Sequence, residues 1–279
     1  MSDRLASLFS LKGQVVAVTG GYGLIGSVLS AGLADLGAKV AVLEPAPDDA
    51  RTRELFDDRS DIRVIAADVT KKATLEAALA ELKRHWGTPT GLVANAALDS
   101  PPDAPAEENG PFESYPEASW DRVMEVNAKG VFLCSQVFGR AMAEAGQGSI
   151  VNVASIYGAV SPDQSLYEYR RRRGEVFFKP VAYAASKSAL YNLTRYLAAY
   201  WGPSNVRANT VTFAGVFNKQ DPGFLEAYAG KIPLRRRRPD LANMAEPADY
   251  LGAVAFLLSP ASAYMTGADL RVDGGFLAI

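Results

Sequence analysis

Cysteine and histidine are almost absent from this chain of 279 residues, which holds one of each, Cys134 and His85. A single cysteine cannot form an internal disulfide, so nothing in the sequence calls for an oxidising compartment. The same counts effectively exclude a transition-metal site made of imidazole and thiolate ligands. His85 ends a helical stretch, where a positive charge suits the helix dipole, and we assign it no catalytic role.

Long apolar runs and an excess of one charge are also missing. The apolar runs stay well below the roughly 18 residues that a membrane span needs, and residues 1–13 lack the apolar core of a signal peptide. The formal net charge is -2, so no basic surface is expected for nucleic acid or an anionic membrane. The sequence therefore predicts a cytoplasmic globular protein with a small-molecule substrate, and neither nucleic acid nor a membrane as partner.

Short apolar runs typical of strands alternate with helical patterns along the whole chain. Strands are expected at residues 15–19, 39–44, 62–68, 91–97, 149–155, 206–213 and 270–273. Helices are expected at residues 27–36, 70–86 with Thr70 as N-cap, after a loop over 98–116 as far as Ala145, and at 181–201 and 246–258. This alternation predicts an α/β fold with a single doubly wound parallel sheet of the Rossmann type and helices on both faces. With no repeat or linker, residues 1–279 are expected to form one dinucleotide-binding catalytic domain.

In such a fold, ligands lie at the carboxyl ends of the strands. The first strand runs into the sequence TGGYGLIG at residues 19–26. Glycines here permit a tight turn and let backbone N–H groups approach a pyrophosphate at a helix N-terminus. Glu44 ends the second strand and could accept hydrogen bonds from the adenosine ribose, where its charge would repel a 2′-phosphate. NAD is therefore predicted over NADP, although Glu44 could also be an ordinary solvated strand-end acid.

Tyr183 and Lys187 begin a predicted helix at positions i and i+4, so both side chains lie on one face. A tyrosine with a pKa near 10 is only about 0.1% ionised at pH 7, which makes it a poor base. A nearby ammonium favours the phenolate and makes proton transfer possible. Ser155, at the end of the fifth strand, could hydrogen-bond to a substrate oxygen. Asn127 lies within a predicted helix, where asparagine has only a mediocre propensity. Each of these two could equally have a structural reason.

Together these motifs resemble the short-chain dehydrogenase/reductase family over essentially the full chain. The resemblance is carried by residues 19–26, Asp68-Val69, Asn95-Ala96-Ala97, Val126-Asn127, Ser155, Tyr183 with Lys187, Thr266-Gly267 and Val272-Asp273-Gly274-Gly275. It implies a catalytic tetrad of Asn127, Ser155, Tyr183 and Lys187. It also implies cofactor contacts from Gly20, Tyr22, Gly23, Leu24, Ile25, Gly26, Glu44, Asp68, Val69, Asn95, Ala96, Ala97, Tyr183, Lys187 and Val216.

By this resemblance, Tyr183 exchanges the proton, Ser155 holds the substrate oxygen, and Lys187 binds the nicotinamide ribose and tunes Tyr183. Asn127 supports a water that leads protons to Lys187. The expected activity is an NAD(H)-dependent oxidoreductase that interconverts a secondary alcohol and a ketone. The family also implies a homo-oligomer, either a dimer or a tetramer.

The chain departs from the family pattern at several places. Gly23 occupies the glycine position of the epimerase-like branch, Ala97 stands where glycine is usual, and residues 213–215 replace the usual proline-glycine. Segments 156–180 and 214–245 are expected as substrate-side insertions, and they contain the arginine runs 170–173 and 235–238. Guanidinium groups there would suit a polar, carbohydrate-derived substrate, including an anionic one. The runs could instead be solvated surface, or pair with the acidic loop at Glu107 and Glu108 or with another subunit.

Two other functions stay open on the sequence. An epimerase or dehydratase that retains NAD and acts on a nucleotide sugar fits the glycine spacing, but the short carboxyl-terminal region leaves little chain for nucleotide binding. A non-catalytic cofactor-binding protein has no need of a tuned phenol, so the Ser-Tyr-Lys set argues against it.

Overall fold

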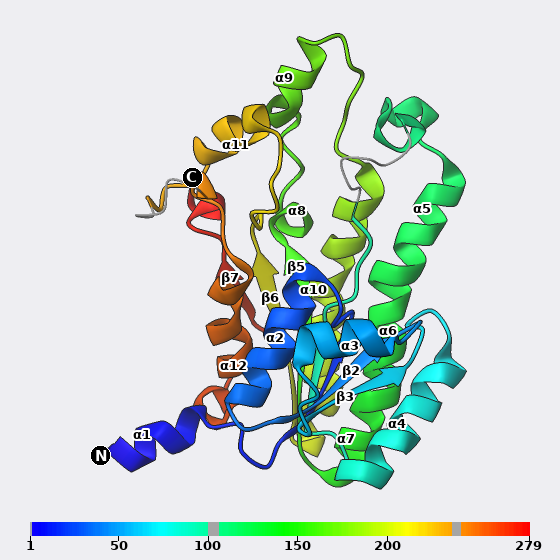
Figure 1. Cartoon of the computed structure of the whole chain (residues 1–279), viewed down its shortest axis with the longest axis vertical. Coiled ribbons are helices and arrows are strands. Elements are labelled where there is room, and N and C mark those ends of the chain that lie inside the picture. Colours follow the sequence, from blue (N-terminus) through cyan, green and yellow to red (C-terminus); the bar gives the residue numbers. More distant parts are fainter. Residues whose placement is uncertain (1, 100–105, 236–240) are drawn as a thin grey trace.

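Seven parallel strands form one sheet in the order β3-β2-β1-β4-β5-β6-β7 (Figure 1). The structure is a computed structural model that describes residues 2–99, 106–235 and 241–279. The strands are β1 (Val15–Thr19), β2 (Lys39–Glu44), β3 (Ile62–Ala66), β4 (Gly91–Ala94), β5 (Gly148–Ser155), β6 (Val206–Phe213) and β7 (Asp269–Val272). The strand order reverses between β1 and β4, which confirms the predicted doubly wound sheet and places its switch point beside the glycine-rich turn.

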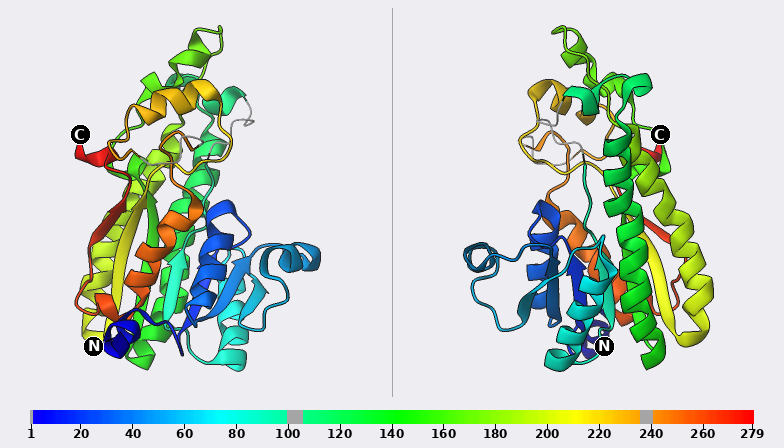
Figure 2. Two further views of the ribbon diagram at one scale, coloured as in Figure 1. Left: turned by 60° about the vertical axis from the view of Figure 1, so that its left-hand side comes forward. Right: turned by 90° about the vertical axis from the view of Figure 1, so that its right-hand side faces the viewer.

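Helices cover both faces of the sheet (Figure 2). One face carries α2 (Leu24–Asp35) and α12 (Leu251–Leu258), with Phe56 of α3 (Asp49–Phe56) packed into the same core. The other face carries α4 (Lys72–Trp86), α10 (Val181–Trp201) and a long helix. Buried aliphatic side chains of the strands lie between these layers, as expected for parallel strands with two covered faces.

The long helix is continuous, but α-helical and π-helical turns alternate along it. It consists of α5 (Glu117–Met124), α6 (Val131–Cys134) and α7 (Arg140–Ala145), joined by π-helical turns at Glu125–Gly130 and Ser135–Gly139. Gly139 faces the ring of Trp201, where a Cβ atom would come within 2.3 Å of the indole. Glycine therefore lets this helix and α10 pack closely. Asn127 lies in the first π-helical turn, a feature often found at functional sites.

The structure differs from the sequence predictions mainly at the ends of elements. β3 stops at Ala66 and β4 at Ala94, and beyond these ends the Asp68 N–H donates to the Thr74 hydroxyl and the Asn95 N–H to the Thr19 hydroxyl. Thr70 as N-cap was wrong: α4 begins after Lys71, and the Thr70 hydroxyl donates to the Asp68 carboxylate at 2.7 Å. The helix predicted over 246–258 starts as a 3₁₀ turn at Pro247–Tyr250. Short helices α1 (Ser2–Phe9), α3, α8 (Ile156–Ala159), α9 (Glu168–Arg171) and α11 (Pro222–Ala229) were not predicted.

The two predicted insertions lie together beyond the carboxyl ends of the strands, where α8, α9 and α11 are seen in Figure 1. We call residues 156–180, 214–235 and 241–245 the cap. Its core is largely aromatic and joins both segments, with Tyr157, Leu166, Tyr167, Phe177, Tyr228, Ile232 and Met244 all buried. Ion pairs also link the segments, between Asp163 and Lys231 at 2.7 Å and between Arg173 and Asp221 at 3.0 Å.

Candidate active site

The predicted catalytic residues meet at the carboxyl end of β5. Ser155 is the last residue of β5, and its Oγ accepts a hydrogen bond from the Tyr157 backbone N–H, which caps α8. Tyr183 lies in the first turn of α10, where its phenol hydrogen-bonds to the Ser155 side chain. The arrangement gives a hydroxyl and a phenol that can share one substrate oxygen.

Lys187 completes this group from the second turn of α10. Its Nζ donates a 2.8 Å hydrogen bond to the Val153 carbonyl and lies 5.9 Å from the centre of the Tyr183 ring. The residue is only 2% exposed, and burial lowers the pKa of Lys187 to about 8, while the charge of Asp99 raises it. Burial and then Asp99 raise the pKa of Tyr183, and the bond from Ser155 lowers it. Lys187 can therefore exchange a proton closer to neutral pH than an exposed lysine can.

Asn127 joins three elements of the site. Its Oδ1 accepts from the Leu98 N–H at 2.7 Å, and its Nδ2 donates to the Leu98 carbonyl at 2.9 Å and to Ser186 Oγ at 3.0 Å. The Ser186 hydroxyl in turn donates to the Tyr183 carbonyl at 2.8 Å. The buried carboxamide therefore ties the segment after β4 and the start of α10 to the long helix, which supports a positioning role.

The glycine-rich turn has the geometry of a pyrophosphate cradle. Gly20 has a φ of 67°, and a Cβ atom on Gly26 would lie 2.1 Å from the Gly20 carbonyl oxygen. Gly23 is the N-cap of α2 and has no side chain to cap the helix, and the first turn holds no acidic residue. Backbone N–H groups at the start of this 12-residue helix suit the phosphates of a dinucleotide.

Glu44 lies next to this turn at the end of β2. Its Oε1 accepts a 2.7 Å hydrogen bond from the Tyr22 N–H, and burial raises the pKa of Glu44 while this bond lowers it. The Tyr22 phenol is itself held by Asp48 and Thr52, at 3.1 and 2.6 Å. The carboxylate is therefore fixed at the place where the adenosine ribose is expected.

The remaining predicted cofactor residues surround the switch point. The Asn95 side chain donates to the carbonyls of Thr19 and Gly20, so its amide holds the turn in place. The Asp68 carboxylate bonds Thr70 and Lys71. The others lie along the same edge of the sheet: Leu24 and Ile25 at the start of α2, Val69 against Gly130, Ala96 bonded to Thr19, Ala97 exposed after β4, and Val216 paired with Ala245.

Sequence reasoning missed an ion pair beside Tyr183. Lys179 Nζ contacts Asp99 Oδ1 and lies 5.1 Å from the centre of the Tyr183 ring. The two residues are 80 positions apart, so no local pattern could pair them. Lys179 precedes Tyr183 by four residues, but Pro180 separates it from the helix, and helical spacing does not apply there.

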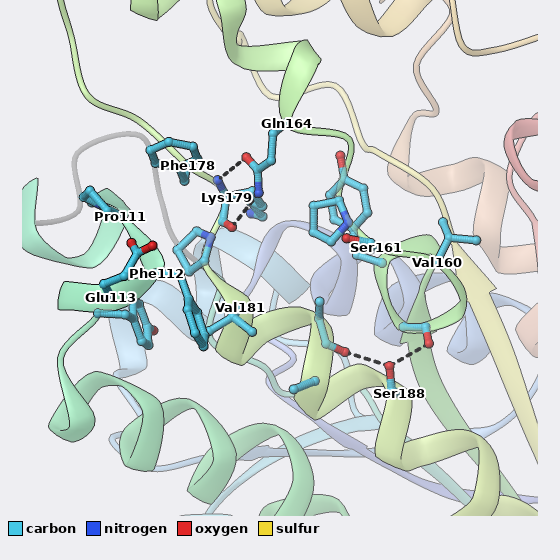
Figure 3. Close-up of a pocket in the computed structure, with 18 of the residues that line it drawn as sticks. Pro111, Phe112, Glu113, Val160, Ser161, Gln164, Phe178, Lys179, Val181 and Ser188 are labelled. Atoms are coloured by element: carbon cyan, nitrogen blue, oxygen red, sulfur yellow. Dashed lines mark hydrogen bonds between the residues drawn. The ribbon is translucent and has the colours of Figure 1, made fainter.

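A cavity of about 660 Å³ adjoins this site (Figure 3). It is lined by residues of the segment before α5, by residues 157–162 and by the first turns of α10. Ala184, Ala185 and Ser188 contribute from α10, whereas Tyr183 and Lys187 lie on another face of that helix. The cavity therefore flanks the group formed by Ser155, Tyr183 and Lys187 rather than containing it, and Lys179 is one of its lining residues.

The first arginine run is largely engaged within the cap. Arg170 pairs with Glu175 and stacks on Phe177, and Arg171 pairs with Glu168. These contacts support a structural role for the run. In the second run, Arg235 donates to the Ala229 carbonyl, and residues 236–238 lie outside the described part of the chain.

The acidic loop at Glu107 and Glu108 does not pair with the arginine run 170–173, an alternative that the sequence had left open. Glu108 instead bonds Ser119 and Arg122. Among the described residues, histidine, cysteine and carboxylate side chains form no cluster able to hold a metal ion. Nor does any helix within 2–99, 106–235 or 241–279 combine the length and apolar content needed to cross a membrane.

Comparison with known proteins adds independent evidence. A short-chain dehydrogenase/reductase family model, described as enoyl-(acyl carrier protein) reductase, matches residues 24–277. Galactitol 2-dehydrogenase of Rhizobium johnstonii is 35% identical over 269 residues, which cover 96% of each chain. D-threitol dehydrogenase of Mycolicibacterium smegmatis is 33% identical over 270 residues, covering 96% of this chain and 94% of its own.

A solved structure agrees with these sequence relatives. A short chain dehydrogenase from Leptospira borgpetersenii with bound NAD+ superposes with a TM-score of 0.80 and 31% identity, over 95% of this chain and 93% of the other. These relatives favour a dehydrogenase over the epimerase and the non-catalytic binder that the sequence left open. The chain belongs to the short-chain dehydrogenase/reductase family and is an NAD(P)-dependent dehydrogenase or reductase acting on CH–OH groups.

Proposed function

We propose that this enzyme uses NAD to interconvert a secondary alcohol and a ketone on a polyol or another carbohydrate-derived substrate. The observation that carries the chemistry is the contact of Tyr183 with Ser155 beside the buried ammonium of Lys187. We also propose that residues 1–279 act as one catalytic domain, with the cap as its substrate side.

Each residue of the group has a defined task in this proposal. Bound nicotinamide supplies the hydride acceptor or donor. In the oxidising direction, Ser155 holds the substrate hydroxyl and the Tyr183 phenolate accepts its proton. The Lys187 ammonium favours the phenolate electrostatically. Asn127 keeps α10 and the segment after β4 in register through its bonds to Leu98 and Ser186.

The preference for NAD rests on Glu44. Its Oε1 is fixed by the Tyr22 N–H, so the carboxylate cannot turn away from the ribose position without losing that bond. A carboxylate there accepts hydrogen bonds from ribose hydroxyls and repels the 2′-phosphate of NADP. The solved relative with bound NAD+ is consistent with this choice.

The substrate class rests on the relatives and on the cap. Galactitol and D-threitol, named for two relatives, are both polyols. The first arginine run supplies little support for an anionic substrate, since Arg170, Arg171 and Arg173 already have carboxylate partners. We therefore favour a neutral polyol.

A homo-oligomer is part of the proposal. Phe132 of α6 and the stacked pair Tyr196 and Tyr200 of α10 are exposed on the two long helices. Exposed aromatic groups of this kind are typical of association surfaces. Light scattering coupled to size-exclusion chromatography would give the number of subunits, and a monomer would contradict this point.

A substrate panel tests the proposed function. Galactitol, D-threitol, gluconate and a cyclic alcohol would each be incubated with NAD+ or NADP+ while the absorbance of the reduced cofactor is followed. We expect the highest kcat/KM for a neutral polyol with NAD+. Turnover of gluconate alone would move the substrate to the anionic class. No reduced cofactor with any alcohol, and none consumed with the corresponding ketones, would overturn the proposal.

A further inference from the structure

Lys179 and Asp99 form a charged pair next to the catalytic tyrosine, and neither belongs to a motif of the sequence. Lys179 Nζ contacts Asp99 Oδ1 and lies 5.1 Å from the Tyr183 ring centre, slightly nearer than Lys187 Nζ at 5.9 Å. The Lys179 side chain is only 8% exposed, whereas that of Asp99 is 55% exposed. The Lys179 ammonium is therefore a second buried cation beside the Tyr183 phenol, whereas its counter-ion Asp99 is exposed to solvent.

Amide side chains hold the backbone at Lys179 and next to Asp99. Gln164 accepts a hydrogen bond from the Lys179 N–H at 2.9 Å and donates to the Lys179 carbonyl at 3.1 Å, as Figure 3 shows. Asn127 makes the same two kinds of bond to Leu98, the residue before Asp99. These bonds hold the backbone of Lys179 and of the residue before Asp99 in place. The fold therefore brings the two charged residues to the same side of the site.

The charge of Asp99 acts on the site. After burial, the charge of Asp99 is the next cause of the raised pKa of Tyr183, and it raises the pKa of Lys187 against the effect of burial. Charged and titratable groups face Tyr183 from several elements: Asp99 after β4, Tyr157 of α8, Lys179 before α10, Lys187 and Tyr191 of α10, and Tyr250 before α12. Asp99 is the anion in this set and Lys179 is its direct partner.

We propose that Lys179 and Asp99 are positioning residues for proton transfer, in which the Lys179 ammonium stabilises the Tyr183 phenolate and the Asp99 carboxylate opposes it. A cation about 5 Å from the ring centre of a tyrosine in a partly dry site lowers the energy of the phenolate, and a nearby anion raises it. The pair thus sets the pH at which Tyr183 becomes an effective base. This inference rests on the proposed role of Tyr183.

Two variants test the pair with opposite signs. Lys179→Met keeps the aliphatic packing and removes the cation, while Asp99→Asn keeps an acceptor for Lys179 and removes the anion. We would measure kcat/KM for oxidation of galactitol by NAD+ against pH, or of the panel polyol that turns over fastest. Lys179→Met should shift the rising limb of this pH profile to higher pH by about one unit, which lowers kcat/KM roughly tenfold at pH values below the limb. Asp99→Asn should shift the limb to lower pH. Lys179→Arg should stay near the unmodified enzyme, and Lys179→Met with Asp99→Asn should lie between the single variants.

A direct titration separates this inference from the proposed function. The Cζ resonance of labelled tyrosine, assigned with Tyr183→Phe, reports the ionisation of Tyr183 without substrate. The pH midpoint of this titration should rise in Lys179→Met and fall in Asp99→Asn. If Tyr183→Phe is inactive but neither variant moves the limb or the resonance, the inference is wrong and the function stands. If both variants shift the limb in one direction, they disturb the fold, and the inference is again wrong. An active Tyr183→Phe would overturn the role of Tyr183 itself.

Discussion

The Lys187 ammonium donates a 2.8 Å hydrogen bond to the carbonyl of Val153, two residues before Ser155 on β5. This bond anchors α10, which carries Tyr183 and Lys187, to the strand that carries Ser155. It also satisfies one of the three N–H donors of the buried Lys187 ammonium. Burial lowers the pKa of Lys187 to about 8. This bond therefore helps to set the relative placement of Ser155, Tyr183 and Lys187, together with the Tyr191 hydroxyl, which donates to the Ser155 carbonyl.

Replacing Lys187 tests the cost of this buried charge. Because the folded-state pKa of about 8 lies below the ordinary value of 10.5, the unfolded chain binds more protons between these values. The free energy of unfolding should therefore rise with pH in this window through Lys187, by at most about 3 kcal/mol. Lys187→Met lacks this contribution, so its stability relative to the unmodified protein should fall between pH 8 and pH 10 in urea unfolding experiments. Lys129→Met, at an exposed lysine, should show a constant difference, and a constant difference for Lys187→Met would contradict the prediction.

Tyr183→Phe should abolish turnover while leaving NAD+ affinity within a few-fold. The variant keeps the ring and removes only the hydroxyl that exchanges the proton, so a loss of several orders of magnitude in kcat is expected. Tyr264→Phe, at a fully exposed tyrosine outside the site and the proposed association surface, is the control and should keep normal rates. Near-normal activity in a correctly folded Tyr183→Phe protein would remove Tyr183 from the mechanism.

Glu44→Ala should narrow the preference for NAD+ over NADP+. Loss of a charge-assisted hydrogen bond to the ribose should weaken the use of NAD+ by roughly 1–3 kcal/mol, and the repulsion of the 2′-phosphate disappears at the same time. The measurement is the ratio of kcat/KM for the two cofactors. Glu54→Ala, which removes an exposed carboxylate of α3, should leave this ratio unchanged. A preference for NADP+ in the unmodified enzyme would show that the role given to Glu44 is wrong.

Gly26→Ala adds only one methyl group but should strongly disturb the glycine-rich turn at residues 19–26. A Cβ atom there would lie 2.1 Å from the Gly20 carbonyl oxygen and 2.8 Å from Gly21 Cα, both backbone atoms that cannot rotate away. We expect weaker NAD+ binding by calorimetry and a lower melting temperature. Gly252→Ala in α12 has no atom within 4 Å of the new methyl group and should stabilise the protein slightly, by about 0.5–1 kcal/mol. Equal effects of the two substitutions would argue against the crowded turn.

Local sequence patterns predicted most of the elements that position the site. Residues 15–19, 206–213 and 181–201 match β1, β6 and α10 at both ends, because apolar runs between turn residues have few alternative structures. Thr70 shows where such reasoning fails. Its hydroxyl could cap a helix, but Asp68 offers a competing acceptor two residues away. The aromatic residues of the cap gave no periodic signal, so α9 and α11 depend on packing between two distant segments.

The sequence by itself determined the parallel sheet, the glycine turn and the Tyr183–Lys187 pair, because each depends on residues close together in the chain. Tertiary structure decided which groups surround that pair. Asn127 meets Leu98 and Ser186, and Lys179 meets Asp99 across 80 positions, only because the strands β4 and β5 lie side by side in the sheet. Contacts of this length follow from strand order and helix packing, which no short pattern encodes. The charge around Tyr183 is for this reason a property of the fold.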